Sequence, residues 1–88
     1  MNRKNQISFV CQFLREWRKS RQISQEQVKR ATGIDVSNYE ITRSEPGLYN
    51  ILILCEFYEI SFPWLCGIAE EVVAGSMSTE AFFQKAKR

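Results

Sequence analysis

Two short helices joined by a tight turn are predicted in the first half of this chain. Ser24 and Gln27 have the spacing of a capping box, in which the serine oxygen accepts a hydrogen bond from a first-turn N–H and the glutamine side chain reaches back. Gly33 is suited to the left-handed residue that ends a helix. Ile34 is then expected to enter the core, and Asp35 to cap the next helix. A pair of this kind favours a domain built from helices.

Apolar residues at helical spacing predict further helices, and no segment shows the alternation of a strand. The fold class is therefore all-α, with five helices followed by a C-terminal helical extension. We expect the domain to span residues 1–67 and the extension residues 68–88. The expected helices cover residues 7–20, 24–32, 36–41 and 48–58, a short segment capped by Ser61 and ended by Gly67, a continuation over 68–75, and residues 79–87.

Residues that carry catalytic or metal chemistry are scarce. The chain has three single cysteines without CxxC spacing, which argues against a disulfide framework or a zinc site and favours thiols in a reducing cytoplasm. It has no histidine, the usual general base, and no glycine-rich phosphate loop. We expect no enzyme activity, no cofactor and no small-molecule substrate. The longest apolar run, residues 51–55, is too short to span a membrane.

Charge is unevenly distributed although the net charge is only +2. Residues 1–30 carry eight basic and two acidic side chains, which suits contact with phosphates. Residues 31–75 carry seven acidic side chains against Arg43 alone. Such charges can also be plain solvated helix faces.

Six short motifs resemble, in order and spacing, the lambda repressor/Cro-like helix-turn-helix domains of the XRE family. The resemblance covers about residues 12–67, and it implies a five-helix DNA-binding domain, commonly dimeric, that acts in transcriptional regulation. The motifs are Leu14-Arg15-Glu16-Trp17-Arg18, Ile23-Ser24-Gln25-Glu26, Thr32-Gly33-Ile34, Tyr39-Glu40, Ser44-Glu45-Pro46-Gly47-Leu48 and Phe57-Tyr58-Glu59-Ile60-Ser61.

The resemblance implies roles for individual residues. Gln25 matches a glutamine that contacts a phosphate, and Arg43 matches a basic residue in the loop after the recognition helix. Ser37 and Asn38 match the exposed start of the recognition helix, where base edges are read; an asparagine can pair bidentately with adenine.

The basic first helix is expected to lie along the DNA backbone, with Lys19 and Arg21 among the contacts. If Asn38 does not read bases, the loop that begins at Thr42 is the next candidate. Arg18 is expected to pair inside the domain with Glu40 or Glu26.

The sequence departs from the family at four points. The recognition helix is nearly a turn short, and Lys29 replaces a small residue of the preceding helix. Ile41-Thr42 stand where Asn-Gly is usual, and Glu59 stands where a glycine closes the fourth helix.

Two apolar stripes are predicted on the helix over residues 48–58. The inward stripe comprises Leu48, Ile51, Leu54, Cys55 and Tyr58. Tyr49 and Ile53 form a second stripe. Phe82 and Phe83 in the last helix are also apolar and need a packing partner. We expect a two-fold homodimer; an intramolecular lid formed by the tail is the alternative.

These observations predict a cytoplasmic, sequence-specific double-stranded DNA-binding protein that regulates transcription by occupancy, as a repressor. The alternative is a protein-binding module of the same fold, such as an antitoxin or antirepressor, whose acidic middle part docks a basic surface.

Overall fold

Five α-helices make up the described part of this computed structural model, which gives the backbone of residues 3–73 and the side chains of residues 8–71. No strand occurs within that range, so the prediction of an all-α, five-helix fold is confirmed. The helix expected over residues 79–87 lies outside the described residues, as do Phe82 and Phe83. The helices are α1 (Arg3–Ser20), α2 (Gln25–Thr32), α3 (Ser37–Glu40), α4 (Leu48–Tyr58) and α5 (Phe62–Val73).

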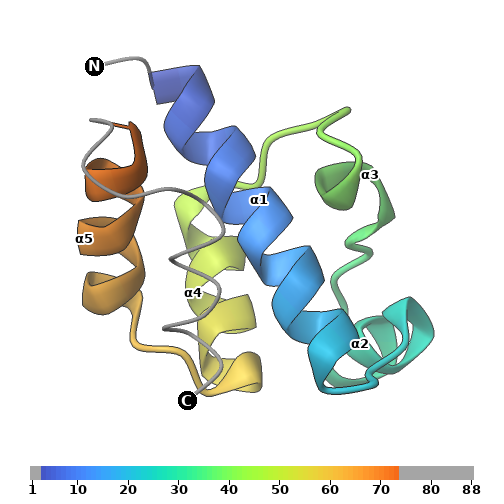
Figure 1. Cartoon of the computed structure of the whole chain (residues 1–88). Coiled ribbons are helices and arrows are strands. Elements are labelled where there is room, and N and C mark those ends of the chain that lie inside the picture. The colour runs from blue at the N-terminus through green and yellow to red at the C-terminus, as the bar shows by residue number, and fades with distance from the viewer. Residues whose placement is uncertain (1–2, 74–88) are drawn as a thin grey trace.

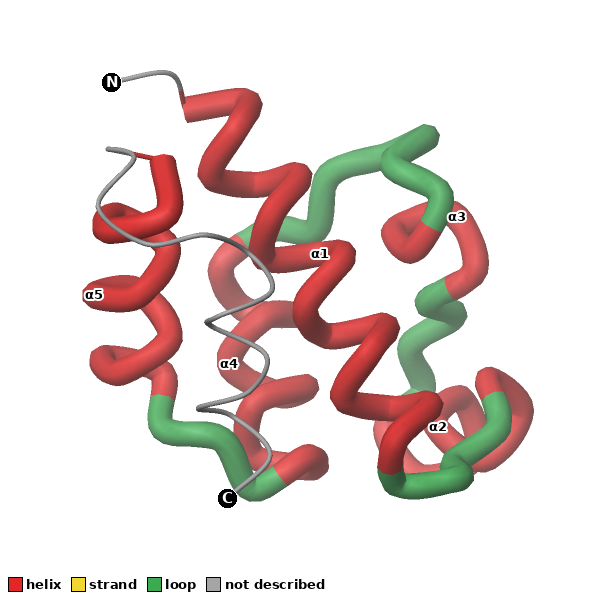
Figure 2. The backbone as a smooth tube through the Cα atoms, viewed as in Figure 1, coloured by secondary structure: helices red, strands yellow, loops and turns green. Residues whose placement is uncertain are grey.

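The long α1 crosses the molecule and holds the other helices together. Figure 1 shows α5 on one side of α1 and the α2–α3 pair on the other, with α4 between α5 and α1. α1 packs against α5 and α3, and α2 packs against α4. The tube in Figure 2 shows that loops, without regular structure, join α2 to α3 and α3 to α4. The α2–α3 pair therefore projects from a frame formed by α1, α4 and α5.

The core lies where these helices meet, and Phe13 of α1 is at its centre. Phe13 is 1% exposed, and its ring contacts those of Trp17 at 5.6 Å and Trp64 at 6.2 Å between centroids. The expectation that Ile34 enters the core is confirmed. The buried cluster comprises Phe9, Phe13, Leu14, Val28, Ile34, Val36, Leu54, Cys55, Tyr58, Ile60, Leu65, Ile68 and Ala69.

The termini of α2 follow the prediction. Ser24 Oγ accepts from the backbone N–H of Gln27, and the Gln27 side chain accepts from the backbone N–H of Ser24 at 2.7 Å, which completes the capping box. Gly33 adopts the left-handed conformation at φ 80°, and its N–H donates to the carbonyl of Lys29. Local sequence signals are sufficient here because every partner lies within a few residues.

Three predicted helix ends were wrong. α1 begins at residue 3 rather than 7. α5 does not end at Gly67 but continues to Val73, because Ile68 and Ala69 in the next turn are buried against the core; the helical continuation expected over residues 68–75 is confirmed as far as Val73. A glycine inside a helix costs only about 1 kcal/mol, less than two buried side chains return. The N-cap of α3 is Val36 and not Asp35, although Asp35 Oδ1 still accepts from the backbone N–H of Ser37 at 3.0 Å.

The predicted faces of α4 were partly wrong as well. Leu54, Cys55 and Tyr58 are buried as expected, but Leu48 is 61% exposed. Ile53, which was assigned to an outer stripe with Tyr49, packs partly buried against the core. The exposed apolar residues of α4 are instead Leu48, Tyr49 and Leu52.

Candidate nucleic-acid interface

An ion pair between α1 and α3 fixes the position of the short α3. Arg18 Nε donates to Glu40 Oε2 at 2.7 Å, and Arg18 Nη2 donates to Glu40 Oε1 at 3.0 Å. Arg18 Nη1 donates to the carbonyl of Ile23, at the entry to α2, at 2.7 Å. The Arg18 and Glu40 side chains are only 11% and 4% exposed. The hydrogen bond with Glu40 raises the pKa of Arg18. The prediction that Arg18 pairs within the domain is confirmed.

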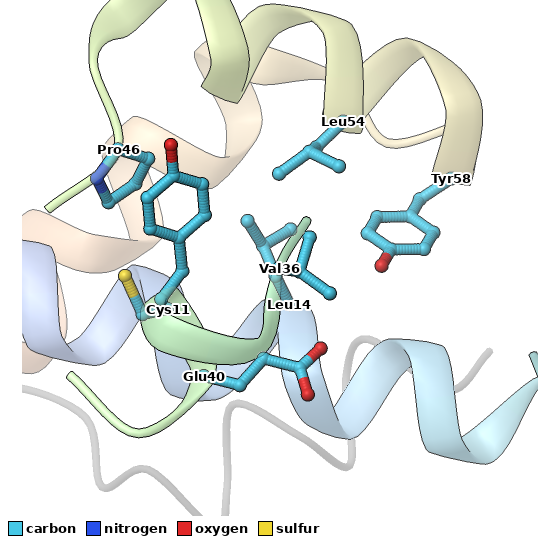
Figure 3. Close-up of a pocket in the computed structure, with 8 residues that line it drawn as sticks. Cys11, Leu14, Val36, Glu40, Pro46, Leu54 and Tyr58 are labelled. Atoms are coloured by element: carbon cyan, nitrogen blue, oxygen red, sulfur yellow. The ribbon is translucent and has the colours of Figure 1, made fainter. Parts of the chain in front are cut away.

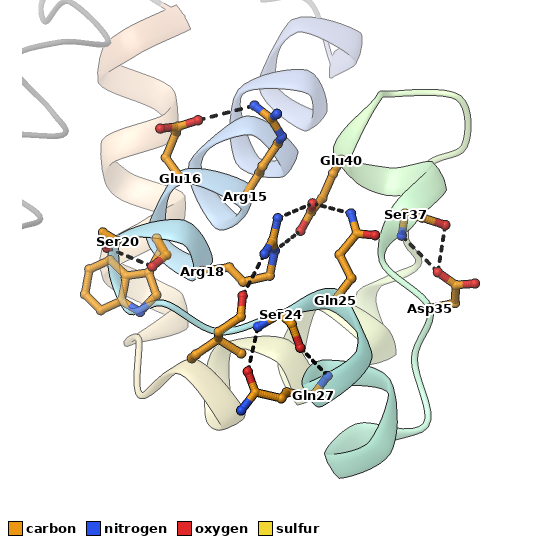
Figure 4. Close-up of polar contacts among 12 residues, drawn as sticks. Arg15, Glu16, Arg18, Ser20, Ser24, Gln25, Gln27, Asp35, Ser37 and Glu40 are labelled. Carbon is orange, nitrogen blue, oxygen red and sulfur yellow. Dashed lines mark hydrogen bonds and ion pairs between the residues drawn. The ribbon is translucent and has the colours of Figure 1, made fainter.

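Gln25 joins this pair from the first turn of α2. Its Nε2 donates to Glu40 Oε1 at 2.9 Å, so Glu40 is bonded to α2 as well as to α1. Figure 4 shows Arg18, Glu40 and Gln25 meeting between α1, α2 and α3. The exposed Gln25 side chain is thereby anchored at the surface where α2 begins.

α3 is a single turn, which agrees with the predicted shortening. Ser37 Oγ donates to Asp35 Oδ1 at 2.7 Å, and these bonds from Ser37 lower the pKa of Asp35. Asn38 is exposed. Its backbone carbonyl accepts from the N–H of Arg43 at 2.9 Å, which folds the following loop back onto α3.

A hydrogen bond that the sequence did not reveal ties α3 to α4. Asn50 Nδ2 donates to the hydroxyl of Tyr39 at 3.0 Å, and the half-buried Tyr39 ring packs against the core. No local pattern marks this pair, since its residues lie on different helices. α3 is thus a one-turn helix that is bonded to α1 and to α4, and it lies beside the start of α2.

Residues 14–65, more than half of the chain, match the helix-turn-helix family. The chain belongs to this family. Its members are lambda repressor-like, DNA-binding regulators of transcription of the XRE type, and they are typically not enzymes.

One curated relative resembles the chain beyond the family motif. The chain is 31% identical over 64 residues to the uncharacterized HTH-type transcriptional regulator YobD of Bacillus subtilis (strain 168). The alignment covers 69% of this chain but only 57% of the relative, so the chain spans a little over half of that protein. No solved structure matches the chain.

The helix-turn-helix geometry brings five of the seven predicted DNA-contacting residues close to α3, with the Thr42 N–H bonded to the carbonyl of Tyr39. Ser37 and Asn38 lie on α3, Gln25 is bonded to Glu40 at its end, and Arg43 follows in the loop bonded to Asn38. Thr42 precedes Arg43 with φ 57°, the left-handed region, where the family usually has a glycine. A β-branched residue is strained there.

Lys19 and Arg21 lie at the C-terminal end of α1, which ends at Ser20. Figure 4 shows Ser20, which stands between them in the sequence, on the opposite side of the Arg18–Glu40 pair from Ser37. The Arg21 guanidinium lies 4.0 Å from the centroid of the Trp17 ring, in a cation–π contact. The Trp17 indole N–H in turn donates to the carbonyl of Tyr58 at 3.1 Å. Arg21 is therefore packed on an aromatic ring, apart from α3.

A small cavity lies beneath α3, with Glu40 and Tyr58 in its wall (Figure 3). Its volume of about 10 Å³ holds no more than one water molecule. Burial raises the pKa of Tyr58, and it raises the pKa of the Cys11 thiol to about 11. The lining residues are Cys11, Leu14, Val36, Tyr39, Glu40, Pro46, Leu54 and Tyr58.

Residues 3–73 contain neither a cluster of metal ligands nor a single helix that could span a membrane. No group of three or more histidine, cysteine, aspartate or glutamate side chains is placed to hold a metal ion there. No single helix in that range is long and apolar enough to cross a membrane. α4 and the part of α5 up to Glu71 together have the length and apolar composition of a membrane span, but the two helices are bent by 109° relative to each other.

Proposed function

We propose that this protein binds double-stranded DNA sequence-specifically as a homodimer and represses transcription in the cytoplasm by occupying its site. The observation that carries the proposal is the bond from Gln25 to Glu40, which holds an amide at the start of α2 against α3, the helix that carries the exposed Asn38. A positioned amide donor at a helix N-terminus suits a phosphate oxygen.

Few side chains of α3 can contact base edges, because this helix has only four residues. Asn38 is exposed and Ser37 is half-buried and bonded to Asp35, so Asn38 is the principal candidate. The loop of residues 42–44 is bonded to the Asn38 carbonyl and lies close enough to α3 to add contacts. Arg43 in that loop supplies a charge for a phosphate.

Lys19 and Arg21 enter the proposal only as peripheral phosphate contacts, because they lie at the end of α1 and not on α3 or the loop that follows it. The division into a DNA-binding domain of residues 1–67 and an extension of residues 68–88 stays a prediction. α5 runs through that boundary, so a truncation after Gly67 removes the buried Ile68 and Ala69.

Selection of bound sequences from random duplex DNA tests the proposal. A homodimer with two recognition helices about 34 Å apart should enrich two inverted half-sites about one helical turn apart. Affinity for the enriched site should fall steeply with salt as counterions are released. No duplex binding at about 50 mM salt would contradict the proposal and favour the protein-binding alternative.

A further inference from the structure

The outer face of α4 is apolar and has no cover within the described residues. Leu48, Leu52 and Glu56 are spaced by four residues and form one exposed row, with Tyr49 beside it. Leu48, Tyr49 and Leu52 are 61%, 76% and 42% exposed. The opposite face of α4 is already buried in the core. A helix with apolar residues on two opposite faces is usually covered by other protein segments on both of them.

The two ends of this outer α4 face, defined as Leu48, Tyr49, Leu52 and Glu56, are complementary in charge. Gly47 is the N-cap of α4 and has no side chain to accept from the first-turn N–H groups, and that turn contains no acidic residue. The helix N-terminus therefore carries a partial positive charge that no side chain of its N-cap or first turn offsets. Glu56 is exposed at the other end of the row.

We infer that two copies of this chain pack through antiparallel α4 helices, with Leu52 at the two-fold axis. Leu48 and Glu56 are each four residues from Leu52, about 6 Å along the helix. Antiparallel packing therefore places Glu56 of each copy beside the α4 N-terminus of the other. Parallel packing would bring the two Glu56 carboxylates together and leave both N-termini uncapped.

A second copy fits this face better than DNA does. α4 contains no basic residue, and its exposed row is apolar apart from the acidic Glu56, so only the helix N-terminus could attract a phosphate. Its acidic end and its uncapped end lie at equal distances from Leu52, which is the self-complementarity that a two-fold interface requires. The inference gives the surface for the homodimer in the proposed function, and its tests need no DNA.

Sedimentation equilibrium of the full chain tests the apolar part of the interface. Leu52→Glu should weaken dimerisation at least tenfold, because it places two carboxylates at the axis. Ile41→Glu is the matched control, since Ile41 is 60% exposed and lies outside α4; it should leave the dimer intact. Helical circular dichroism should be unchanged in both variants. If Leu52→Glu does not fold, Leu48→Glu at the edge of the face gives the same test.

The charged end is tested by Glu56→Gln, which should raise the dimer dissociation constant about 3- to 30-fold, since each dimer loses two helix-terminus interactions. Glu70→Gln, an exposed acidic residue of α5, is the control and should have no effect.

Disulfide trapping tests the register in a Cys66→Ser background, because Cys66 is the exposed native thiol. Leu52→Cys should crosslink two copies through residue 52. In a mixture of the two single variants, Leu48→Cys should crosslink to Glu56→Cys, and neither should crosslink efficiently to itself. Crosslinking of residue 48 to 48 and of 56 to 56 would overturn the antiparallel arrangement.

A chain that is monomeric at every concentration would overturn both this interface and the proposed homodimer, while leaving DNA binding to be judged by the selection experiment. A dimer that persists in Leu52→Glu and Leu48→Glu would overturn this interface alone.

Discussion

Arg18 and Glu40 are joined by two side-chain hydrogen bonds, of 2.7 and 3.0 Å, across 22 residues of sequence. The pair connects α1 to α3, and both side chains are almost removed from solvent. α3 has only one turn and buries none of its own residues fully. Its position therefore depends on this pair and on the contacts of Tyr39.

Loss of one partner of this pair should strongly destabilise the fold. Arg18→Ala leaves the Glu40 carboxylate buried without its cation, and we expect the free energy of unfolding to fall by about 3–5 kcal/mol. Urea unfolding followed by circular dichroism measures the change. Arg15→Ala is the matched control: Arg15 pairs with Glu16 at 3.4 Å with both side chains about 40% exposed, so its loss should cost about 0–1 kcal/mol. Equal losses in the two variants would contradict a structural role for the buried pair.

Two of the three left-handed residues other than glycine in the described part of the chain, Thr42 and Glu59, should limit stability. Thr42 and Glu59 have φ values of 57° and 60°, and the Glu59 N–H bonds back to the end of α4. Thr42→Gly and Glu59→Gly remove the strain of a side chain in this region, at the smaller entropic cost of glycine. We expect each to raise the free energy of unfolding by up to about 1 kcal/mol.

The control for these variants is Lys29→Gly in the exposed interior of α2, which should instead lower the free energy of unfolding by about 1 kcal/mol. Destabilisation by all three glycines would show that the left-handed conformation carries no strain at Thr42 and Glu59.

Asn38 and Arg43 should affect DNA binding in different ways. Asn38→Ala is expected to relax the preference at one base pair, by about 1–3 kcal/mol, because base-edge contacts carry the sequence information. Arg43→Ala should weaken binding to all sequences equally and reduce the salt slope by about one, as the loss of a phosphate contact does. Competition binding against single-base variants of the enriched site separates the two effects. An unchanged preference profile in Asn38→Ala would move base reading to the loop of residues 42–44.

Asp35 should make a small contribution to stability that depends on pH. Its pKa is lowered from 3.8 by the hydrogen bonds from the Ser37 side chain and backbone. A carboxylate with a lowered pKa in the folded state stabilises that state above pH 3.8, and the contribution disappears as the pH falls through the lower folded value. Asp35→Asn should therefore flatten the acid limb of unfolding free energy against pH, measured by urea unfolding between pH 5 and about 2. An unchanged acid limb would show that the Ser37 bonds do not favour the charged form.

The sequence by itself determined the local structure and the identity of the fold. The capping box of Ser24 and Gln27, the left-handed Gly33 and the limits of α4 were all predicted, because their interactions join residues three or four positions apart. The Arg18–Glu40 pair could also be predicted from the sequence, because both residues belong to the motifs that resemble the family. The helix-turn-helix architecture followed from the order of those motifs.

Only the tertiary structure decided how the apolar residues of α4 divide between the core and the surface. α4 has apolar residues on both its inner and its outer face, so its sequence could not show that Ile53 packs inward while Leu48 is exposed. α5 continues past Gly67, a residue typical of a helix end, because Ile68 and Ala69 are buried in the core. Burial depends on partners far away in the chain, and periodicity reports only the preferences of the helix itself.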